Sequence, residues 1–363
     1  MKLLIQHPHY GNEISGVLTY VNILKKELQK KSIKVKVVST KEPFRRWLSV
    51  IYWSDIVHMN SNNTLFALFC KLFRKKIIIK YHYTFFKSTA YKYKPMSFIN
   101  RIKKEILFSI PKSNYPLKWK LHTFVKLGSL FGRIITAYLS NIHVSCSKYI
   151  AKSLSFPWSV YNLYNPIAFP NRQKLKNLKD LKYPFTFVFV GRLDKDKGID
   201  ILLKATKMLQ NKNKKFNVLI IGCGSEFEEL KKLSEELGIS KQIKFLGKIS
   251  NKKAINIVKN SLALIAPSRW NDPAPYVALE AGSVGTLSIV SDKGGLPEVG
   301  GPSAFIFKNE SYKKLAKYME YCLDNPQEAL KRGIEANKYI KENFSSIKAA
   351  NQLIRICNKL MAK

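Results

Sequence analysis

The sequence predicts an α/β protein with two doubly wound parallel sheets, each in a domain of its own. The chain has 363 residues, which is too long for a single ordinary hydrophobic core, and 46% of them are hydrophobic, enough for two. Short apolar runs alternate with helical patterns, as in parallel sheets that helices cover on both faces. The alternation lapses in a Lys- and Asn-rich stretch over residues 165–184 and then starts again, which indicates a domain boundary.

We therefore expect a Rossmann-like domain over residues 1–168 and a second one over residues 183–342. Residues 343–363 are expected to form a C-terminal helix that packs back towards the first domain.

The first domain should contain five short buried strands. Between the first two, Val17, Val21 and Leu24 recur at intervals of three or four residues, which predicts an amphipathic helix. The expected strands cover residues 2–6, 35–39, 56–59, 77–81 and 142–145.

The second domain shows the same alternation more regularly. Its expected strands cover residues 185–190, 217–221, 243–246, 262–266 and 287–291. The helices between them are expected over residues 199–210, 226–237, 254–260 and 276–281, and further helices follow from Ser311 onward.

The charge is strongly basic and unevenly distributed. The chain has 63 Lys and Arg against 24 Asp and Glu, a net charge of +39. Between Lys71 and Lys152 there are eighteen basic residues and one acid, Glu105. Drift of codon composition explains part of the lysine content, but the asymmetry favours an anionic partner for the first half, either membrane lipid or nucleic acid.

The five cysteines are scattered, with no C-x-x-C pair and no histidine cluster at metal spacing. Neither a disulfide framework nor a structural zinc is therefore expected, and a reducing cytoplasm fits best. The apolar run after Met1 and Lys2 is three residues long, far short of a secretory signal, and no run approaches the ~18–20 apolar residues of a membrane span. We expect a soluble or membrane-peripheral protein.

Two carboxylates, Asp272 and Glu280, stand eight positions apart at the expected start of the helix over residues 276–281, where Pro273 and Pro275 suit a helix entry. Glu280 lies on the helix, whereas Asp272 lies in the loop beyond its positive end. One acid can then reach a bound sugar and the other a nucleotide ribose. Acid pairs at this spacing are common in sequences, so what this pair indicates depends on the motifs around it.

Three candidate anion sites follow strands of the second domain. Arg192 and Lys197 bring two cations to the point where an open parallel sheet holds a phosphate, each contact contributing about 1.5–3 kcal/mol. The glycines within residues 221–224 resemble a phosphate loop that lacks its third glycine, and the backbone N–H groups of Tyr276 and Val277 form a helix N-terminus. A solvated basic loop and a plain turn are the alternatives for the first two, but three sites on one sheet favour a nucleotide.

These motifs resemble those of the retaining glycosyltransferases of family 4, which have the GT-B fold of two Rossmann-like domains facing across a cleft. The resemblance is most specific over residues 187–298 and looser in the first domain. In the second domain it is carried by Phe-Val-Gly-Arg-Leu at 189–193, Lys197-Gly198, Leu-Ile-Ile-Gly-Cys-Gly at 219–224, Ile-Lys-Phe-Leu-Gly at 243–247, Pro-Ser at 267–268 and Gly-Gly-Leu-Pro-Glu at 294–298. In the first domain it is carried by Ser-Gly-Val at 15–17, Ser-Asp-Ile-Val-His at 54–58, His82, Cys146-Ser147 and Tyr-Asn-Pro at 164–166.

The resemblance implies donor-binding roles in both domains. Arg192 and Lys197 would hold the donor diphosphate, and Gly16 would approach it from the first domain. Glu280 would accept hydrogen bonds from the ribose hydroxyls, and the backbone around Gly247 would meet the base.

The resemblance also implies that Asp272 and His82 are the catalytic residues. Asp272 would contact hydroxyls of the transferred sugar, and His82 would hold the sugar or assist near the reacting carbon. The acceptor would attack from the face that the diphosphate leaves, which retains the anomeric configuration. The family usually has Glu at the position of Asp272, so the carboxylate is set back by about 1.5 Å, the length of one C–C bond. This departure implies a compensating loop, a different donor sugar or lost catalysis.

Asp194 and Asp196 form a D-x-D pattern of the kind that binds Mg²⁺ or Mn²⁺ elsewhere. The resembled family needs no metal, so we expect a solvated loop here, no metal site and no cofactor. The nucleotide sugar would be a substrate.

The region between His82 and Ile142 is basic and aromatic and has the length of an insertion. Its first helical pattern has apolar Phe98, Ile102, Ile106 and Ile110 opposed by Arg101, Lys104 and Glu105. This stripe is either core or an interfacial helix on an anionic leaflet, where each nearby cation contributes about 1 kcal/mol. Nothing resembles an RNP sequence, a zinc finger or a helix-turn-helix, so a nucleic-acid partner is not expected.

Together these features predict a retaining, metal-independent glycosyltransferase that uses a UDP- or GDP-sugar. Its expected acceptor is a glycan or lipid-linked glycan of surface polysaccharide, lipopolysaccharide or glycolipid biosynthesis, and its expected place is the inner face of the cytoplasmic membrane. The alternative is a catalytically weak or silent GT-B scaffold that acts as a binding partner, and a nucleic-acid-binding protein is the less favoured alternative.

Overall fold

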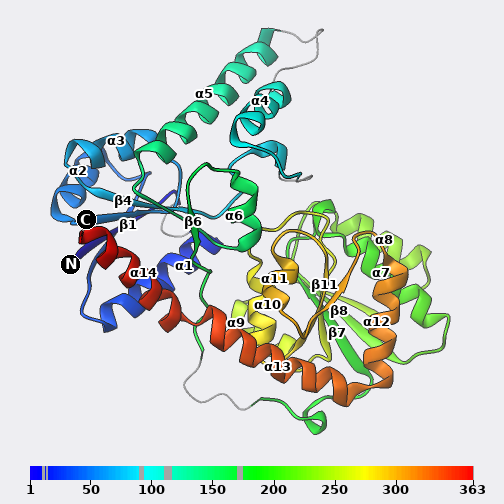
Figure 1. The fold of residues 1–363 in the computed structure, drawn as a ribbon. Coiled ribbons are helices and arrows are strands. Elements are labelled where there is room, and N and C mark those ends of the chain that lie inside the picture. Colours follow the sequence, from blue (N-terminus) through cyan, green and yellow to red (C-terminus); the bar gives the residue numbers. More distant parts are fainter. Residues whose placement is uncertain (10–12, 14, 90–93, 110–116, 170–174, 363) are drawn as a thin grey trace. The chain divides into compact units, whose positions relative to one another are not determined.

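The computed structural model describes residues 1–363 except 10–12, 14, 90–93, 110–116, 170–174 and 363 (Figure 1). The chain divides into two compact units. Unit 1 consists of Met1–Pro166 and Ser346–Lys363, and unit 2 of Ile167–Ser345. Each unit contains a six-stranded sheet whose neighbouring strands are all parallel, with helices on both faces. The predicted class, α/β with two doubly wound parallel sheets, is confirmed.

The sheet of unit 1 has the strand order β2-β1-β3-β4-β5-β6. The order reverses between β1 and β3, so this is the point outside the carboxyl ends where such a sheet binds ligands. The strands are β1 (Lys2–His7), β2 (Lys34–Ser39), β3 (Ile56–Met59), β4 (Lys76–Tyr81), β5 (Ile142–Ser145) and β6 (Val160–Asn162). The three-residue β6 was not predicted, because so short a run gives no pattern.

Helices α1 and α14 cover one face of this sheet. The side chains of Leu3 and Ile5, which alternate along β1, lie in one buried cluster with Val21 of α1 and Leu353 of α14. Helices α2 and α3 contact the strands as well. The helices of unit 1 are α1 (Gly16–Lys30), α2 (Phe44–Trp53), α3 (Thr64–Leu72), α4 (Phe98–Ser109), α5 (Leu117–Leu139), α6 (Lys148–Leu154) and α14 (Ser346–Met361), with a 3-10 turn η1 (Lys87–Thr89).

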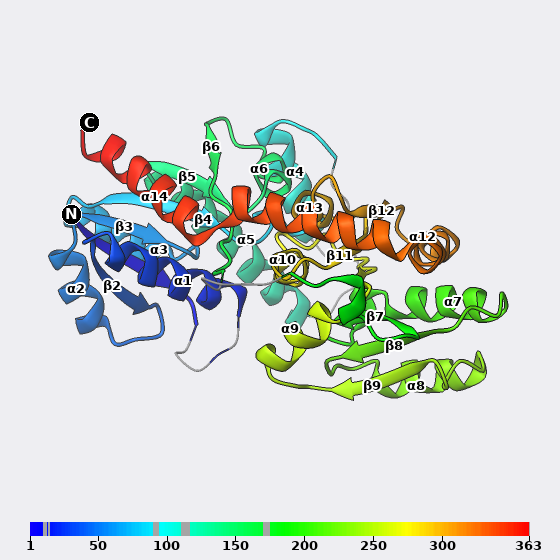
Figure 2. The same cartoon turned by 90° about the horizontal axis from the view of Figure 1, so that it is seen from below.

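The sheet of unit 2 has the order β12-β11-β10-β7-β8-β9. Counted within the unit, this is the Rossmann order, and its switch point lies between β7 and β10. Figure 2 shows β7, β8 and β9 side by side in that order. The strands are β7 (Phe185–Val190), β8 (Phe216–Ile221), β9 (Ile243–Gly247), β10 (Ala263–Ala266), β11 (Leu287–Ser291) and β12 (Phe305–Phe307).

The two faces of the second sheet have separate cores. Phe187 and Phe189 of β7 lie in a cluster with side chains of α7, α8 and α12, whereas Val188 lies in a cluster with side chains of α9 and α10. Alternate residues therefore face opposite helical layers, which is why β7 is apolar at every position except Thr186. The helices are α7 (Ile199–Gln210), α8 (Phe227–Glu236), α9 (Asn251–Lys259), α10 (Tyr276–Ser283), α11 (Leu296–Gly300), α12 (Tyr312–Asp324) and α13 (Pro326–Phe344), with 3-10 turns η2 (Leu178–Asp180) and η3 (Lys195–Lys197).

The orientation expected for α4 is wrong. Arg101 and Glu105, expected on the solvent side, are buried, while Phe98 packs its ring 6.1 Å from that of Phe86 and 5.9 Å from that of Trp158. Glu105 turns inward because its two carboxylate oxygens accept hydrogen bonds from the backbone N–H groups of Lys87 (2.7 Å) and Ser88 (2.9 Å).

The large exposed apolar side chains of α4 are instead Ile99, Leu107 and Phe108. Ile110, the last residue of the expected stripe, lies outside the described residues. Across the described ranges, no helix has the length and apolar character needed to cross a membrane.

Candidate active site

The loops after β7 and β8 meet closely at the carboxyl edge of the sheet of unit 2, next to the switch point. Leu193 N donates to Cys223 O (2.9 Å), and Gly191 N donates to Ile221 O (3.0 Å). Gly222 has φ +139°, and a Cβ there would stand 1.8 Å from Gly191 O, so this approach requires glycine. These contacts hold the loop that follows β7 at the carboxyl end of the sheet, and Arg192 lies in this loop.

Lys197 and Asp272 form an ion pair beside this loop. Lys197 Nζ lies 3.1 Å from Asp272 Oδ2, and the two side chains are 18% and 23% exposed. Lys197 ends η3, and Gly198 turns the chain into α7 with φ +66°, where a Cβ would stand 2.3 Å from Pro267 O. Residues 75 positions apart are thus brought together: the expected diphosphate ligand and the expected sugar ligand.

Arg192 is held by the D-x-D acids. Its guanidinium contacts Asp194 Oδ2, and Nη2 lies 3.6 Å from Asp196 Oδ2, while the side chain stays 68% exposed. Asp194 Oδ1 also accepts from Ser225 N (3.2 Å), which fixes the loop to the start of the α8 segment. A diphosphate would compete with these carboxylates for the guanidinium.

Among the described residues, no group of three or more His, Cys, Asp or Glu side chains could hold a metal ion.

Arg269 joins the loop that carries Lys197 to the loop that carries Asp272, a role that was not predicted. Its guanidinium donates to both carboxylate oxygens of Asp200 (2.6 and 2.8 Å) and to Glu310 Oε2 (2.9 Å). Nη1 donates to Lys195 O (3.1 Å) as well. The hydrogen bonds that Arg269 donates to Asp200 and Glu310 raise the pKa of Arg269, so its guanidinium stays charged.

The backbone of Asp272 is braced by the loop after β11. Gly295 N donates to Asp272 O (2.7 Å), and Gly294 N donates to Asn271 Oδ1 (3.2 Å). A Cβ at Gly294, where φ is +58°, would stand 2.4 Å from Asp272 O. The Gly-Gly pair therefore lets two loops approach closely enough to fix the carboxylate.

Helix α10 presents Tyr276 and Val277 in its first turn and Glu280 one turn later. Pro275 at the N-cap supplies no side-chain hydrogen bond, so the N-terminal N–H groups depend on other partners. Glu280 Oε1 accepts from Asn251 Nδ2 of α9 (2.9 Å), and burial raises the pKa of Glu280.

Gly247 ends β9 with φ +65°, and an added Cβ there would meet no atom within 4 Å. Its carbonyl accepts from Gly222 N (2.9 Å), which joins the loops after β8 and β9. The backbone at Gly247 is therefore held to the phosphate loop and has open space on its other side.

His82 follows β4 in unit 1 and is buried. Its Nε2 lies 2.9 Å from Asn60 Oδ1. Asn60 Nδ2 donates to the carbonyls of Gln6 (3.1 Å) and His58 (3.3 Å), so the amide oxygen must face His82. His82 therefore carries its proton on Nε2, and Nδ1 is left as a hydrogen-bond acceptor. Asn60 was not predicted as a site residue.

The surroundings of His82 keep it neutral. Burial, followed by the charges of Lys80 and His58, holds the pKa of His82 well below its usual value. Lys80 is itself buried, with Nζ 3.5 Å from the centroid of the Tyr20 ring, and burial lowers its pKa strongly. Above its lowered pKa, His82 is a hydrogen-bond partner and not a cation.

Gly16 is the first residue of α1, whose N-cap Ser15 accepts from Leu18 N (3.1 Å). One turn later, the Tyr20 ring packs edge-on 5.1 Å from His82. Gly16 and His82 thus both lie at the carboxyl edge of the sheet of unit 1, and the other seven expected residues belong to unit 2. Residues 10–12 and 14, before Gly16, lie outside the described residues.

Comparison with known proteins finds sequence similarity for the second unit. Residues 171–342 match the family model of the glycosyl transferases group 1. An uncharacterized glycosyltransferase of Methanocaldococcus jannaschii is 29% identical over 190 residues, which are 51% of this chain and 48% of that protein. A D-inositol 3-phosphate glycosyltransferase of Corynebacterium jeikeium is 31% identical over 137 residues, which are 35% and 32% of the two chains. The chain thus spans about half or less of these curated relatives.

Among solved structures, the Anabaena protein Alr3699/HepE in complex with UDP has a similar fold. Its TM-score is 0.72 at 14% identity, over 99% of this chain and 100% of that chain. This likeness concerns the fold, whereas the family match concerns the sequence of the unit that carries Arg192, Lys197, Asp272 and Glu280. Residues 171–342, which make up most of unit 2, are therefore similar in sequence to the glycosyl transferases group 1.

Proposed function

We propose that the protein transfers a sugar from a nucleotide diphosphate donor to a glycan or lipid-linked acceptor, with retention of the anomeric configuration. The observation that carries the proposal is the Lys197–Asp272 ion pair beside Arg192, at the switch point of a Rossmann sheet whose sequence matches a glycosyltransferase family. A cation for the diphosphate and an acid for the sugar are thereby held in contact.

On the donor side, Arg192 and Lys197 bind the diphosphate, since both ammonium and guanidinium groups form charge-assisted hydrogen bonds with phosphate oxygens. Glu280 accepts from the ribose hydroxyls, and the base lies at the open backbone of Gly247. UDP and GDP are the proposed carriers. The Anabaena neighbour is described as a complex with UDP, and we extend that ligand class to this chain.

At the reacting sugar, Asp272 accepts hydrogen bonds from hydroxyls and His82 accepts one through Nδ1. The charge that develops on the departing diphosphate is stabilised by Arg192 and Lys197, which are in place before the bond breaks. These two cations supply the role that a divalent metal has in other transferases, so we propose a metal-independent reaction.

We propose that the protein acts at an anionic membrane surface. Leu65, Leu68 and Leu72 share one exposed face of α3, and Leu72 is 72% exposed. The exposed Leu107 and Phe108 of α4 replace Phe98, Ile102 and Ile106 as the residues proposed to insert. Together with the excess of basic residues between 71 and 152, these side chains favour a lipid-linked acceptor.

The test is a thermal-unfolding panel of nucleoside diphosphates and their sugars, followed by turnover with the donor that stabilises most. At 100 times its dissociation constant a ligand stabilises by about 2.7 kcal/mol. The proposal is wrong if no nucleoside diphosphate stabilises the wild type, or if Arg192→Ala and Lys197→Ala leave the stabilisation unchanged. Donor binding without any turnover would instead favour the silent scaffold, for which Asp272 in place of Glu is the motivating observation.

A further inference from the structure

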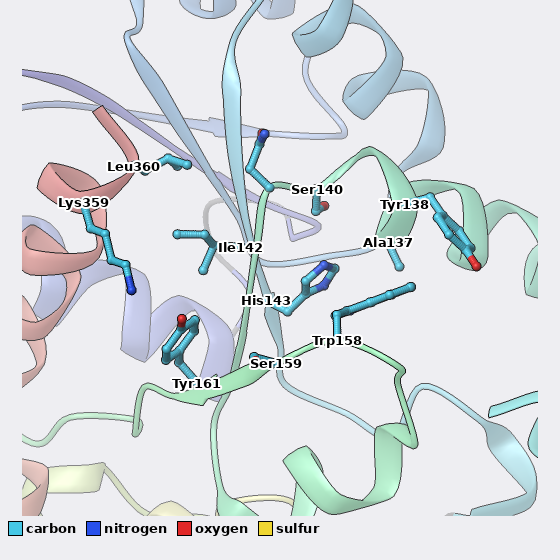
Figure 3. A pocket seen from close by; sticks show the side chains of 11 residues that line it. Ala137, Tyr138, Ser140, Ile142, His143, Trp158, Ser159, Tyr161, Lys359 and Leu360 are labelled. Atoms are coloured by element: carbon cyan, nitrogen blue, oxygen red, sulfur yellow. The ribbon is translucent and has the colours of Figure 1, made fainter. Parts of the chain in front are cut away.

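Unit 1 contains a cavity of about 380 Å³ at the edge strand of its sheet, within the usual size range of small-ligand sites (Figure 3). Ser140 and Asn141 precede β5, and Ser159 precedes β6, so the cavity lies at the amino ends of these strands. Asn60 and His82 follow the carboxyl ends of β3 and β4. A four-residue parallel strand spans about 10 Å, so the cavity is separate from the candidate active site. The lining residues that could bind a ligand include Tyr138, His143, Trp158, Ser159, Tyr161 and Lys359.

One wall of the cavity is aromatic and held in place. The Trp158 ring lies 5.0 Å from that of His143, 4.9 Å from that of Phe156 and 5.1 Å from that of Tyr138. Figure 3 shows Trp158 and Tyr138 on one side, Tyr161 and Lys359 on the other, and His143 between them. Rings fixed by their neighbours lose little conformational entropy when a ligand packs on them.

The charge around the cavity is positive. None of the described lining residues is acidic, and Lys359 Nζ lies 5.9 Å from the centroid of the Tyr161 ring. Two more ammonium groups contact lining residues: Lys71 Nζ donates to Asn141 Oδ1 (2.9 Å) and Lys76 Nζ donates to the Leu360 carbonyl (2.7 Å). Burial lowers the pKa of His143 to about 4, so near pH 7 it is a neutral hydrogen-bonding group.

We propose that this cavity binds an acidic sugar residue of the glycan, as a holding site separate from the site of transfer. A pyranose ring has a C–H face that packs on the negative face of an aromatic ring, here Trp158 or Tyr161. Its hydroxyls find partners in Ser159 and His143, and its carboxylate or phosphate pairs with Lys359. The choice of a glycan as ligand rests on the proposed function, but the binding itself does not require turnover.

The test is calorimetric titration of the full chain with a hyaluronan tetrasaccharide, whose glucuronate units carry carboxylates, and with the neutral chitotetraose. We expect the acidic tetrasaccharide to bind at least about tenfold more tightly. Trp158→Ala should weaken this binding about tenfold and Lys359→Gln about fivefold. Arg355→Gln removes a charge from the same helix outside the cavity and should change the affinity less than twofold.

Several results would overturn the proposal. These are absence of binding by the wild type, equal binding of both tetrasaccharides, or equal effects of Lys359→Gln and Arg355→Gln. Binding of myo-inositol 1-phosphate without the acidic tetrasaccharide would assign the cavity to a lipid headgroup and also overturn it. Because Lys359 is exposed, its substitution should leave folding intact, which thermal unfolding checks. Donor stabilisation of Lys359→Gln, measured in parallel, separates failure of this proposal from failure of the transferase proposal.

Discussion

The ammonium group of Lys197 lies 3.1 Å from the carboxylate of Asp272, so the proposed ligands of the diphosphate and of the sugar hold each other. Each partner fixes the position of the other. Arg269 and the Gly294-Gly295 turn fix the two loops that carry them. Asp272, the shorter acid, thus has a defined partner in Lys197. Phosphate oxygens that bind Lys197 would displace the Asp272 carboxylate in part.

The first prediction separates the two halves of this pair. Lys197→Ala should weaken binding of nucleoside diphosphates about tenfold or more, because a charge-assisted hydrogen bond contributes about 1.5–3 kcal/mol. Asp272→Ala should lower turnover about 10²-fold and leave diphosphate affinity within about threefold. Calorimetry and initial rates measure both effects. Asp324→Ala, which breaks the surface pair with Lys214, is the matched control and should change neither. Equal loss of diphosphate affinity in both site variants would contradict the assignment.

The second prediction concerns the D-x-D acids, which contact Arg192. Asp194→Asn and Asp196→Asn should each change turnover by less than about fivefold, because they remove a competitor of the phosphate and not a metal ligand. Activity should survive EDTA. A complete loss in EDTA that Mn²⁺ restores would show that the metal-independent mechanism is wrong.

The third prediction concerns Glu280 on α10. Glu280→Ala should weaken a nucleoside diphosphate and its sugar alike, because the ribose does not change in the reaction. Burial raises the pKa of Glu280, so the carboxylate form should be lost at a higher pH than for an exposed glutamate. Donor affinity should therefore begin to fall earlier as the pH is lowered. Calorimetry measures this, with Glu236→Ala, a substitution of an exposed glutamate of α8, as the control. Unchanged affinity in Glu280→Ala would falsify the ribose role.

The fourth prediction concerns the tautomer of His82. Nitrogen NMR should find the proton on Nε2, since Asn60 offers an oxygen there. Asn60→Asp puts a negative charge beside Nε2, which favours the imidazolium form and raises the pKa of His82. The variant should then lose activity as the pH falls through the raised pKa, whereas the wild type should show no such loss above pH 6. Asn62→Asp, an exposed neighbour, should behave as the wild type. A proton found on Nδ1 would refute the assignment.

Local patterns were sufficient to predict most of the framework. The run Phe185–Val190 is apolar at every position except Thr186, because both faces of its sheet are covered, and it forms the predicted strand. The acid at position 272 and the turn at Gly294 could be named from motif spacing, whereas their contact depends on a fold that joins two distant loops.

Asn60 and Arg101 show where such patterns fail. The orientation of Asn60 depends on carbonyls of Gln6 and His58, one of which lies 54 positions away in the sequence. Arg101 is buried because it donates to the carbonyl of Lys94, in a segment without periodicity. In both cases the partner is a backbone group that has no signature in the sequence.

The last prediction is that unit 1 binds anionic membranes through α3 and α4. The protein should float with vesicles that contain phosphatidylglycerol and ignore pure phosphatidylcholine, because the attraction is between basic residues and a negative surface. Raising salt from 0.1 to 1 M shortens the Debye length from about 10 to about 3 Å and should weaken this binding. The part of the binding that persists at high salt should depend on apolar side chains that insert into the membrane. Leu107 and Phe108, which are 71% and 60% exposed, are the proposed ones. Leu107→Glu with Phe108→Glu should abolish this salt-resistant part, whereas Ile334→Glu on α13 of unit 2, equally apolar and also exposed, should leave it unchanged. If the wild type fails to float with anionic vesicles even at low salt, the membrane proposal is wrong, and the charge must serve a polyanionic acceptor or reflect composition alone.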